Sequence, residues 1–166
     1  MSFKEINIKD VKDNLVSMVA DEWMLVTAGD RDGFNTMTAS WGFFGEMWNK
    51  ECAITVVRPS RYTYKFLNNS DYFSLCFMGE NRAVHKICGS KSGRDTDKIA
   101  ETGITPVFCN GSIYFEEARV VVICRKLYSS DLLPQNFCNS ECLNSYGGDN
   151  YHRAFVGEIT KVLIQE

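Results

Sequence analysis

The feature that most constrains the fold is a series of short apolar segments, rich in β-branched residues and bounded by glycine, aspartate, asparagine or proline. Such segments occupy residues 23–28, 53–57, 72–78, 112–115, 118–127 and 154–164. Their length and composition are typical of β-strands in a sheet that is covered on one or both faces. The chain is therefore expected to be mainly β.

A hairpin is predicted near the start of this series. Residues 29–33, Gly-Asp-Arg-Asp-Gly, form a turn signal, and the expected return strand, residues 35–42, alternates polar with apolar side chains. Because side chains alternate across a strand, Thr36, Thr38 and Ser40 share one face while Met37, Ala39 and Trp41 share the other.

The helical segments are short. They are predicted at residues 10–18 with Asp10 as the N-cap, at 62–68, at 81–88, and at 95–101 with Gly103 ending the last in the left-handed region. Residues 147–150 are the clearest loop and precede the last strand, where they could cover a site. Many strands with a few short helices indicate an α+β fold, a barrel or sandwich decorated by helices, and residues 1–166 are expected to form one domain.

Charge and composition exclude some classes of function. The net charge of −3 lacks the basic surface of a nucleic-acid-binding protein, so no nucleic-acid partner is expected. The N-terminus lacks the pattern of a signal peptide and no segment approaches the length of a membrane span, so a cytoplasmic protein without membrane association is expected. The aromatic content of 13% indicates that some rings line a pocket or a subunit interface.

The seven cysteines are an odd number in a chain expected to stay inside the cell, which favours reduced thiols over disulfides. Cys52, Cys76 and Cys124 lie in apolar runs and are expected in the core. Cys138 and Cys142 could form a redox or metal pair, but further Cys or His residues at zinc-site spacing do not accompany them. No metal site is predicted.

An anion-binding turn is predicted at the end of the strand at residues 53–57. Pro59 ends that strand, and Ser60 is a candidate N-cap for the helix at 62–68, flanked by Arg58 and Arg61. Paired guanidinium groups suit a phosphate because each can bond two oxygens at once. The alternative is a surface turn with two solvated arginines.

Two further polar segments suit parts of a ligand. Residues 89–98, Gly-Ser-Lys-Ser-Gly-Arg-Asp-Thr-Asp-Lys, offer donors for oxygen but lack the spacing of a P-loop, and the alternative is a solvated loop that caps a helix. The uncharged hydroxyl face of residues 35–41, next to an indole, suits the edge of a planar heteroaromatic ring. The alternative there is an ordinary half-exposed strand.

Taken together, these segments resemble a known family. Asn35-Thr36-Met37-Thr38-Ala39-Ser40-Trp41, Arg58-Pro59-Ser60-Arg61-Tyr62-Thr63 and Gly89-Ser90-Lys91-Ser92-Gly93-Arg94-Asp95, in that order and at those separations, resemble the flavin reductase-like family, most closely its flavoredoxin-type members. The resemblance spans nearly the whole chain and includes residues 152–158, which are similar to the penultimate strand motif of the family.

The resemblance implies an FMN-binding split β-barrel that works as a homodimer, with the flavin near the subunit interface. It implies that the isoalloxazine ring is bordered by Asn35, Thr36, Met37, Thr38, Ser40 and Trp41. It implies that the phosphate is held by Arg58, Ser60, Arg61 and Thr63, joined by the loop of Gly89, Ser90, Lys91, Ser92 and Gly93. FMN, bound tightly or exchangeably, is the expected cofactor.

His152 is the catalytic candidate. In related reductases a histidine at the matching position lies on the substrate side of the flavin, which implies that His152 contacts nicotinamide or the electron acceptor. Tyr151 precedes it here, where an acidic residue is common in several relatives. A packed, purely structural histidine is the alternative.

Three functions follow from the resemblance. The first is an oxidoreductase in which NAD(P)H reduces bound FMN, which then reduces free flavin, a partner oxygenase, ferric iron or another small acceptor. The second is a flavoredoxin-type carrier that exchanges electrons with a redox partner protein. The third is a flavin-binding module without turnover.

Overall fold

A computed structural model describes residues 2–166. Its strands are β1 (Phe3–Ile6), β2 (Met24–Asp30), β3 (Gly33–Ala39), β4 (Gly42–Met47), β5 (Lys50–Val57), β6 (Tyr72–Phe77), β7 (Pro106–Cys109), β8 (Ser112–Phe115), β9 (Val120–Asp131) and β10 (Arg153–Gln165). Its α-helices are α1 (Leu15–Ser17), α2 (Thr63–Asn69), α3 (Arg82–Ser90) and α4 (Lys98–Thr102). Three 3₁₀ turns, η1 (Ile8–Asp10), η3 (Pro134–Asn136) and η4 (Ser140–Ser145), and one π-helical turn, η2 (Met18–Glu22), complete the described elements. No helix within residues 2–166 is long and apolar enough to cross a membrane.

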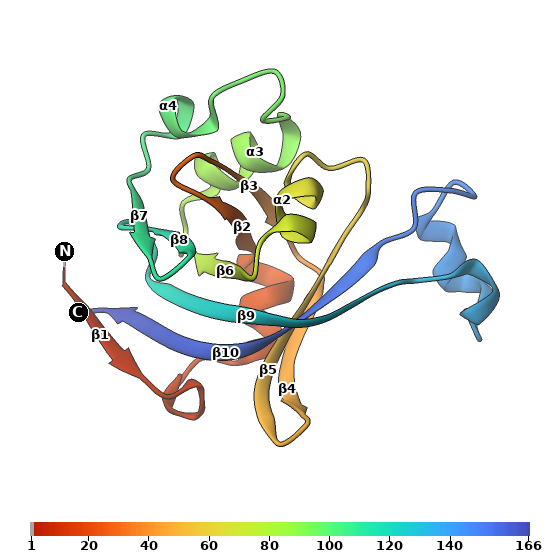
Figure 1. The fold of residues 1–166 in the computed structure, drawn as a ribbon, viewed down its shortest axis with the longest axis horizontal. Helices are drawn as coiled ribbons and strands as arrows, with labels where there is room; N and C mark the ends of the chain where they lie inside the picture. Colours follow the sequence, from red (N-terminus) through yellow and green to blue (C-terminus); the bar gives the residue numbers. More distant parts are fainter. Residues whose placement is uncertain (1) are drawn as a thin grey trace.

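The main sheet is antiparallel and follows the order β3-β2-β6-β9-β10-β5-β4, with β1 added to the C-terminal part of β10. β3 and β4 are the two ends of this order, yet only Ser40 and Trp41 separate them in sequence. The two edges of the sheet must therefore approach each other at that corner, which curls the sheet into an open barrel (Figure 1). The expectation of a mainly β fold with short helices is confirmed.

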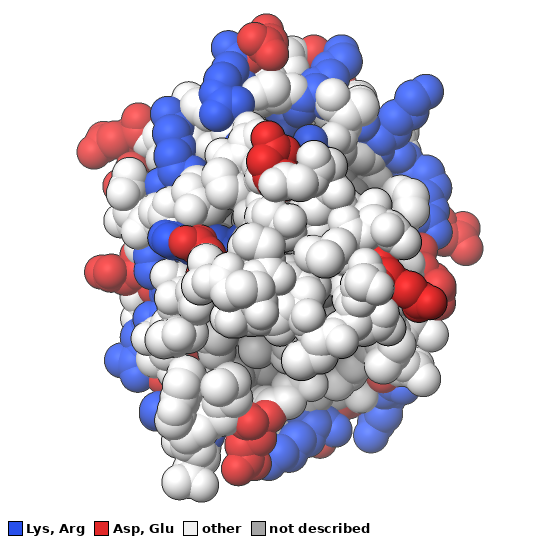
Figure 2. Space-filling model, turned by 90° about the vertical axis from the view of Figure 1, so that its right-hand side faces the viewer, with Lys and Arg blue, Asp and Glu red and all other residues white. Residues whose placement is uncertain are grey.

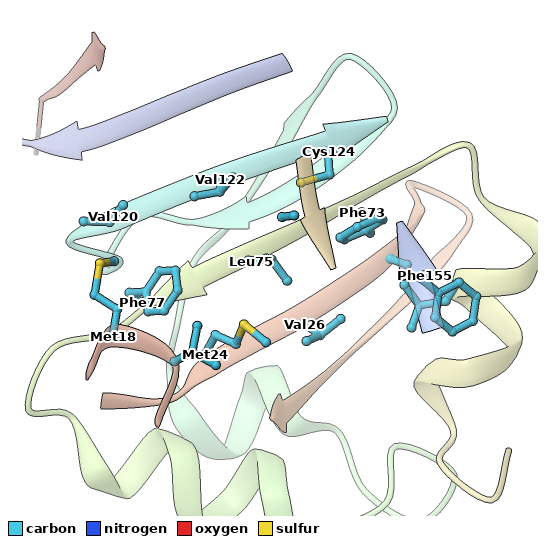
Figure 3. Packing of buried hydrophobic residues seen from close by; sticks show 14 of the residues in the cluster. Met18, Met24, Val26, Phe73, Leu75, Phe77, Val120, Val122, Cys124 and Phe155 are labelled. Atoms are coloured by element: carbon cyan, nitrogen blue, oxygen red, sulfur yellow. The ribbon is translucent and has the colours of Figure 1, made fainter. Parts of the chain in front are cut away.

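Both faces of β2, β6 and β9 are covered, and alternation along these strands divides the core in two. On β2, Met24 and Val26 belong to the core inside the curl, whereas Leu25 faces a second core formed with α3 and the β7–β8 ribbon. The inner core is dense with aromatic and branched side chains, among them Phe73, Phe77, Val122 and Phe155 (Figure 3). Cys76 and Cys124 are fully buried, as expected from their apolar runs.

The expected strands are confirmed, but β1, β4 and β7 were not predicted. β4 is difficult to recognise because it contains Gly42 and Gly45 and its side chains are largely exposed, so apolar and polar residues do not alternate regularly. The return strand predicted over residues 35–42 is too long at its C-terminal end. It stops at Ala39, because the chain crosses there to the other edge of the barrel.

The helix predicted at residues 10–18 is wrong. Asn7 caps the separate turn η1, which contains Asp10, and α1 begins only after Asn14, whose side chain accepts hydrogen bonds from two following backbone N–H groups. Two nearby asparagine caps divide the segment into short turns. The prediction for Gly103 is confirmed, since it ends α4 in the left-handed region at φ 70°.

Residues 132–152 leave the sheet between the two longest strands. Figure 1 shows this excursion, which carries η3 and η4, standing off the ends of β9 and β10. β9 and β10 pair along most of their lengths, up to Arg153 opposite Asp131. On its other side the start of β10 pairs with β5, and Arg153 lies opposite Val57.

Candidate functional site

A cavity of about 400 Å³ lies where β3 and β5 end and β10 begins. This volume is in the range of small-molecule binding sites. Its lining consists of Met37, Thr38, Ala39, Ser40, Trp41, Val56, Val57, Arg58, Ser60, Arg61 and His152. The barrel corner supplies the first five of these residues, and the pairing of β10 with β5 places His152 next to the arginine-bearing turn.

Part of the cavity wall is rich in hydrogen-bond donors. The guanidinium of Arg61 donates to the Gly89 carbonyl at 3.1 Å, and that of Arg58 donates to the Ser145 carbonyl at 2.6 Å. A guanidinium carries five N–H donors, so both arginines keep most of theirs available to a ligand. In the structure Arg58 and Arg61 line the same cavity, as predicted.

Ser60 does not cap α2. The helix begins at Thr63 after Tyr62, which makes no side-chain cap, and the Ser60 hydroxyl instead accepts a hydrogen bond from Asn150 at 2.8 Å. The Ser60 backbone N–H donates to the Asn150 side chain at 3.2 Å. The prediction failed because Asn150, ninety residues along the chain, supplies a partner that local sequence does not reveal.

Part of the cavity wall is aromatic. The rings of Trp41 and His152 lie 4.9 Å apart at an angle of 40°. Only 8% of His152 is exposed, and its Nδ1 is 2.7 Å from the hydroxyl oxygen of Tyr146. Burial, together with the positive charges of Arg58 and Arg61, lowers the pKa of His152 from 6.5 to about 4, so the imidazole is neutral at pH 7.

The hydroxyl face of β3 does not point mainly into this cavity. The Thr36 hydroxyl accepts from that of buried Thr27 at 2.9 Å, and the Thr38 hydroxyl donates to the carbonyl of His85 in α3 at 2.8 Å. Thr38 still lines the cavity, whereas Thr36 does not. The surface that residues 37–41 offer to a ligand therefore consists largely of backbone and of the Ser40 and Trp41 side chains.

Asn35, Thr63 and Gly93 form a separate, internal cluster. The Asn35 amide donates to the buried Thr63 hydroxyl at 2.7 Å, and a Cβ on Gly93 would lie 2.1 Å from the Asn35 side-chain oxygen. Asn35, Thr36 and Gly93 line a second hollow of about 460 Å³ with residues 34 and 94–99. The structure thus gives these predicted site residues internal contacts and does not bring them into the first cavity.

The predicted phosphate loop makes contacts of its own. Ser90 donates to the Lys86 carbonyl, Lys91 pairs with Glu101, and the Ser92 hydroxyl accepts the Arg94 backbone N–H. None of Gly89, Ser90, Lys91, Ser92 or Gly93 lines the first cavity. Gly89 adjoins it, because its carbonyl binds Arg61 and a Cβ added there would lie 3.3 Å from Thr38.

Sequence reasoning missed three residues that shape the site. Tyr146 and Asn150 come from the excursion at 132–152, whose irregular sequence carries no periodic signal. Lys98 is almost fully buried and donates to the carbonyls of Thr36 and Cys88, and burial lowers its pKa. Lys98 belongs to the polar segment 89–98, which the sequence marked as a candidate ligand-binding segment. The segment alone does not show that the Lys98 side chain points inward. Residues 2–166 contain no group of three potential metal ligands.

The flavin reductase like domain matches residues 16–166, and the chain belongs to this family. The structure is similar to a flavoredoxin from Methanosarcina acetivorans, with a TM-score of 0.70 and 20% identity over 87% of this chain and 69% of that one. It is also similar to an FMN-binding domain of a flavin reductase-like enzyme from Shewanella baltica OS155, with a TM-score of 0.68 and 12% identity over 98% and 77% of the two chains. A Shewanella frigidimarina protein with a split barrel domain has a TM-score of 0.68 and 16% identity over 87% of this chain and 67% of that one. These likenesses identify the open barrel as a split barrel. No curated protein sequence matches the chain.

Proposed function

We propose that the protein binds FMN in the cavity between β3, β5 and β10 and acts as an oxidoreductase that takes electrons from NAD(P)H and delivers them to free flavin or another small acceptor. The observation that carries the proposal is the mixed lining of this cavity. Arg58, Ser60 and Arg61 line it together with the Trp41 and His152 rings.

The donor set fits the phosphate end of FMN. Two guanidinium groups with unused N–H donors can take a dianion by charge-assisted hydrogen bonds. The backbone of residues 37–41 and the Ser40 hydroxyl suit the polar edge of a flat ring, and Trp41 suits its face. The protein's own part is then to bind, to orient and to limit access of water, while bound FMN supplies the redox chemistry.

A second candidate function is electron transfer to a redox partner protein. It is favoured by the likeness in structure to a protein named flavoredoxin. In that case the chain would bind FMN in the same cavity but would react poorly with reduced nicotinamide.

Absorbance of the purified protein tests both functions. We expect a yellow protein, or one that becomes yellow when FMN is added, and we expect anaerobic NADH or NADPH to bleach it within seconds. Persistence of the yellow colour with both nucleotides, followed by bleaching with a reduced redox protein, would favour the carrier. Failure to bind FMN at all would reject both.

We further propose that the protein forms a homodimer through the face that includes β4. Large apolar side chains are exposed at the barrel corner, along β4 and at the end of β9: Trp41, Phe43, Met47, Trp48, Tyr128 and Leu133. The ring centroids of Trp48 and Tyr128 are 6.3 Å apart, which joins the turn between β4 and β5 to β9. Figure 2, viewed from the side of the excursion at 132–152, shows a broad face with few charged side chains. Trp41 makes this patch continuous with the cavity, so a second copy seated there would also limit access of water to the flavin.

Placing a charge in the patch is expected to break the dimer. Phe43 is 61% exposed on β4, so Phe43→Glu should leave the fold intact but halve the molar mass measured by light scattering, because a carboxylate would be desolvated at the interface. Ala83→Glu is the matched control, since Ala83 is exposed on α3 in the helical layer. A monomeric parent protein, or a Phe43→Glu variant of unchanged mass, would contradict the proposal.

A further inference from the structure

The excursion at residues 132–152 places one buried polar side chain, that of Tyr146, against His152. Tyr146 is only 9% exposed, and its hydroxyl oxygen lies 2.7 Å from Nδ1 of His152. His152 lines the cavity, whereas Tyr146 does not. Tyr146 therefore reaches the cavity only through side chains that line it, of which His152 is its hydrogen-bond partner.

Tyr146 is held firmly from several directions. Its ring stacks on that of Tyr151 at 4.7 Å, and Phe137 packs against it edge-on at 5.8 Å. The guanidinium of Arg58 lies 4.9 Å from the ring centre and also binds the carbonyl of Ser145. A side chain fixed in this way can impose a hydrogen-bond direction on its partner, since little rotamer freedom remains to be lost.

The direction of the hydrogen bond follows from the two groups. Burial raises the pKa of the Tyr146 hydroxyl and lowers that of His152, so both are neutral near pH 7. Between a neutral phenol and a neutral imidazole, the phenol is the better donor and the imidazole nitrogen the better acceptor. When Nδ1 accepts, the ring proton must reside on Nε2. Within residues 2–166, Nε2 has no hydrogen-bond partner of its own.

We propose that Tyr146 is a positioning residue that holds His152 as the Nε2–H tautomer, so that the imidazole offers a fixed N–H donor to a molecule entering the cavity beside Trp41. The fit is to an oxygen-bearing partner, such as the carboxamide of a hydride donor or a carbonyl group of the electron acceptor. Only the identity of that partner rests on the proposed function. The tautomer itself is a property of the chain without any ligand.

The tautomer can be measured directly by nitrogen-15 NMR of the imidazole rings. The chain has two histidines, His85 and His152, so the spectrum is simple and His85 serves as an internal reference. We expect His152 of the parent protein to be the Nε2–H form, and Tyr146→Phe to convert it to a mixture of tautomers or to the Nδ1–H form. Tyr151→Phe removes a hydroxyl from the stacked neighbour and should leave the tautomer unchanged.

The parent spectrum alone can overturn the proposal, even if a variant folds poorly. An Nδ1–H form of His152 in the parent protein, or an unchanged tautomer in folded Tyr146→Phe, would show that Tyr146 does not set the tautomer.

A kinetic measurement extends the test to the partner. In the FMN-loaded protein, Tyr146→Phe is expected to raise the KM for the reduced nicotinamide roughly 2- to 10-fold, the range for one hydrogen bond, while the affinity for FMN is unchanged. An unchanged KM would show that the N–H does not contact the nicotinamide. Failure of the parent protein to bind FMN would reject the proposed function but leave the tautomer result standing.

Discussion

Replacing Arg61 by alanine is expected to weaken FMN binding by roughly 10- to 150-fold, equivalent to about 1.5–3 kcal/mol for a hydrogen bond to a charged group. Arg61 is half-buried and lines the cavity, and its bond to the Gly89 carbonyl holds the guanidinium in place before a ligand arrives. A pre-positioned guanidinium loses little entropy on binding an anion. Fluorescence titration with FMN would measure the change.

Riboflavin provides the matched ligand control. It lacks the phosphate, so its affinity should be weaker than that of FMN for the parent protein and should change little in Arg61→Ala. Arg31→Ala is the control variant, because Arg31 stacks on Phe108 at the turn between β2 and β3 and does not line the cavity. Arg61→Lys should lose less than Arg61→Ala, since it keeps the charge but not the planar fork. Equal losses for riboflavin and FMN would contradict a phosphate site at Arg61.

Acidification is expected to destabilise the protein between pH 6.5 and pH 4 through His152. The folded-state pKa of about 4 is below the unfolded value of 6.5, so the unfolded chain binds more protons in this interval. The stability that His152 contributes is complete above pH 6.5 and is lost as the pH falls to about 4. A difference of this size corresponds to a loss of the order of 3 kcal/mol. Urea unfolding of the cofactor-free protein at successive pH values would measure it.

His152→Gln separates this loss from other titrations. Burial also lowers the pKa of His85, and hydrogen bonds to Arg153 and to Lys50 lower the pKa values of Asp131 and Glu158, respectively. These groups are present in both proteins, so the difference in slope between parent and variant reports on His152. The variant should show a flatter dependence of stability on pH. Identical slopes would mean that His152 is not held neutral by burial and by the two arginines.

The sequence was most informative where function depends on adjacent residues. The composition of the turn from Arg58 to Arg61 and its position at a strand end can both be read from one short segment. In the structure both arginines line the same cavity. Residues 37–41 also reach that cavity, because the barrel corner lies within the same segment. The family was recognisable for the same reason, since its motifs are local.

Prediction was weakest where a side chain has two possible neighbours. The hydroxyls of Thr36 and Thr38 are equally suited to a ligand and to an internal partner. In the structure, Thr27 on the neighbouring strand β2 bonds the Thr36 hydroxyl, and the His85 carbonyl of α3 bonds that of Thr38. Asn35 and Gly93 were expected at the cofactor. In the structure the Asn35 amide donates to the Thr63 hydroxyl, and a Cβ on Gly93 would lie 2.1 Å from the Asn35 side-chain oxygen. Hydrogen-bonding capacity is a property of the residue, whereas its use depends on what the fold places opposite.

The sequence by itself determined the class of fold, the family and the arginine-bearing turn at the end of β5, because alternation, turn residues and motif spacing act over a few consecutive residues. Only the tertiary structure decided which candidates share a cavity. His152 meets Arg58 through the pairing of β10 with β5, and Tyr146 meets His152 through a long irregular excursion. Contacts of this kind depend on strand order and on loop paths, which no local pattern specifies.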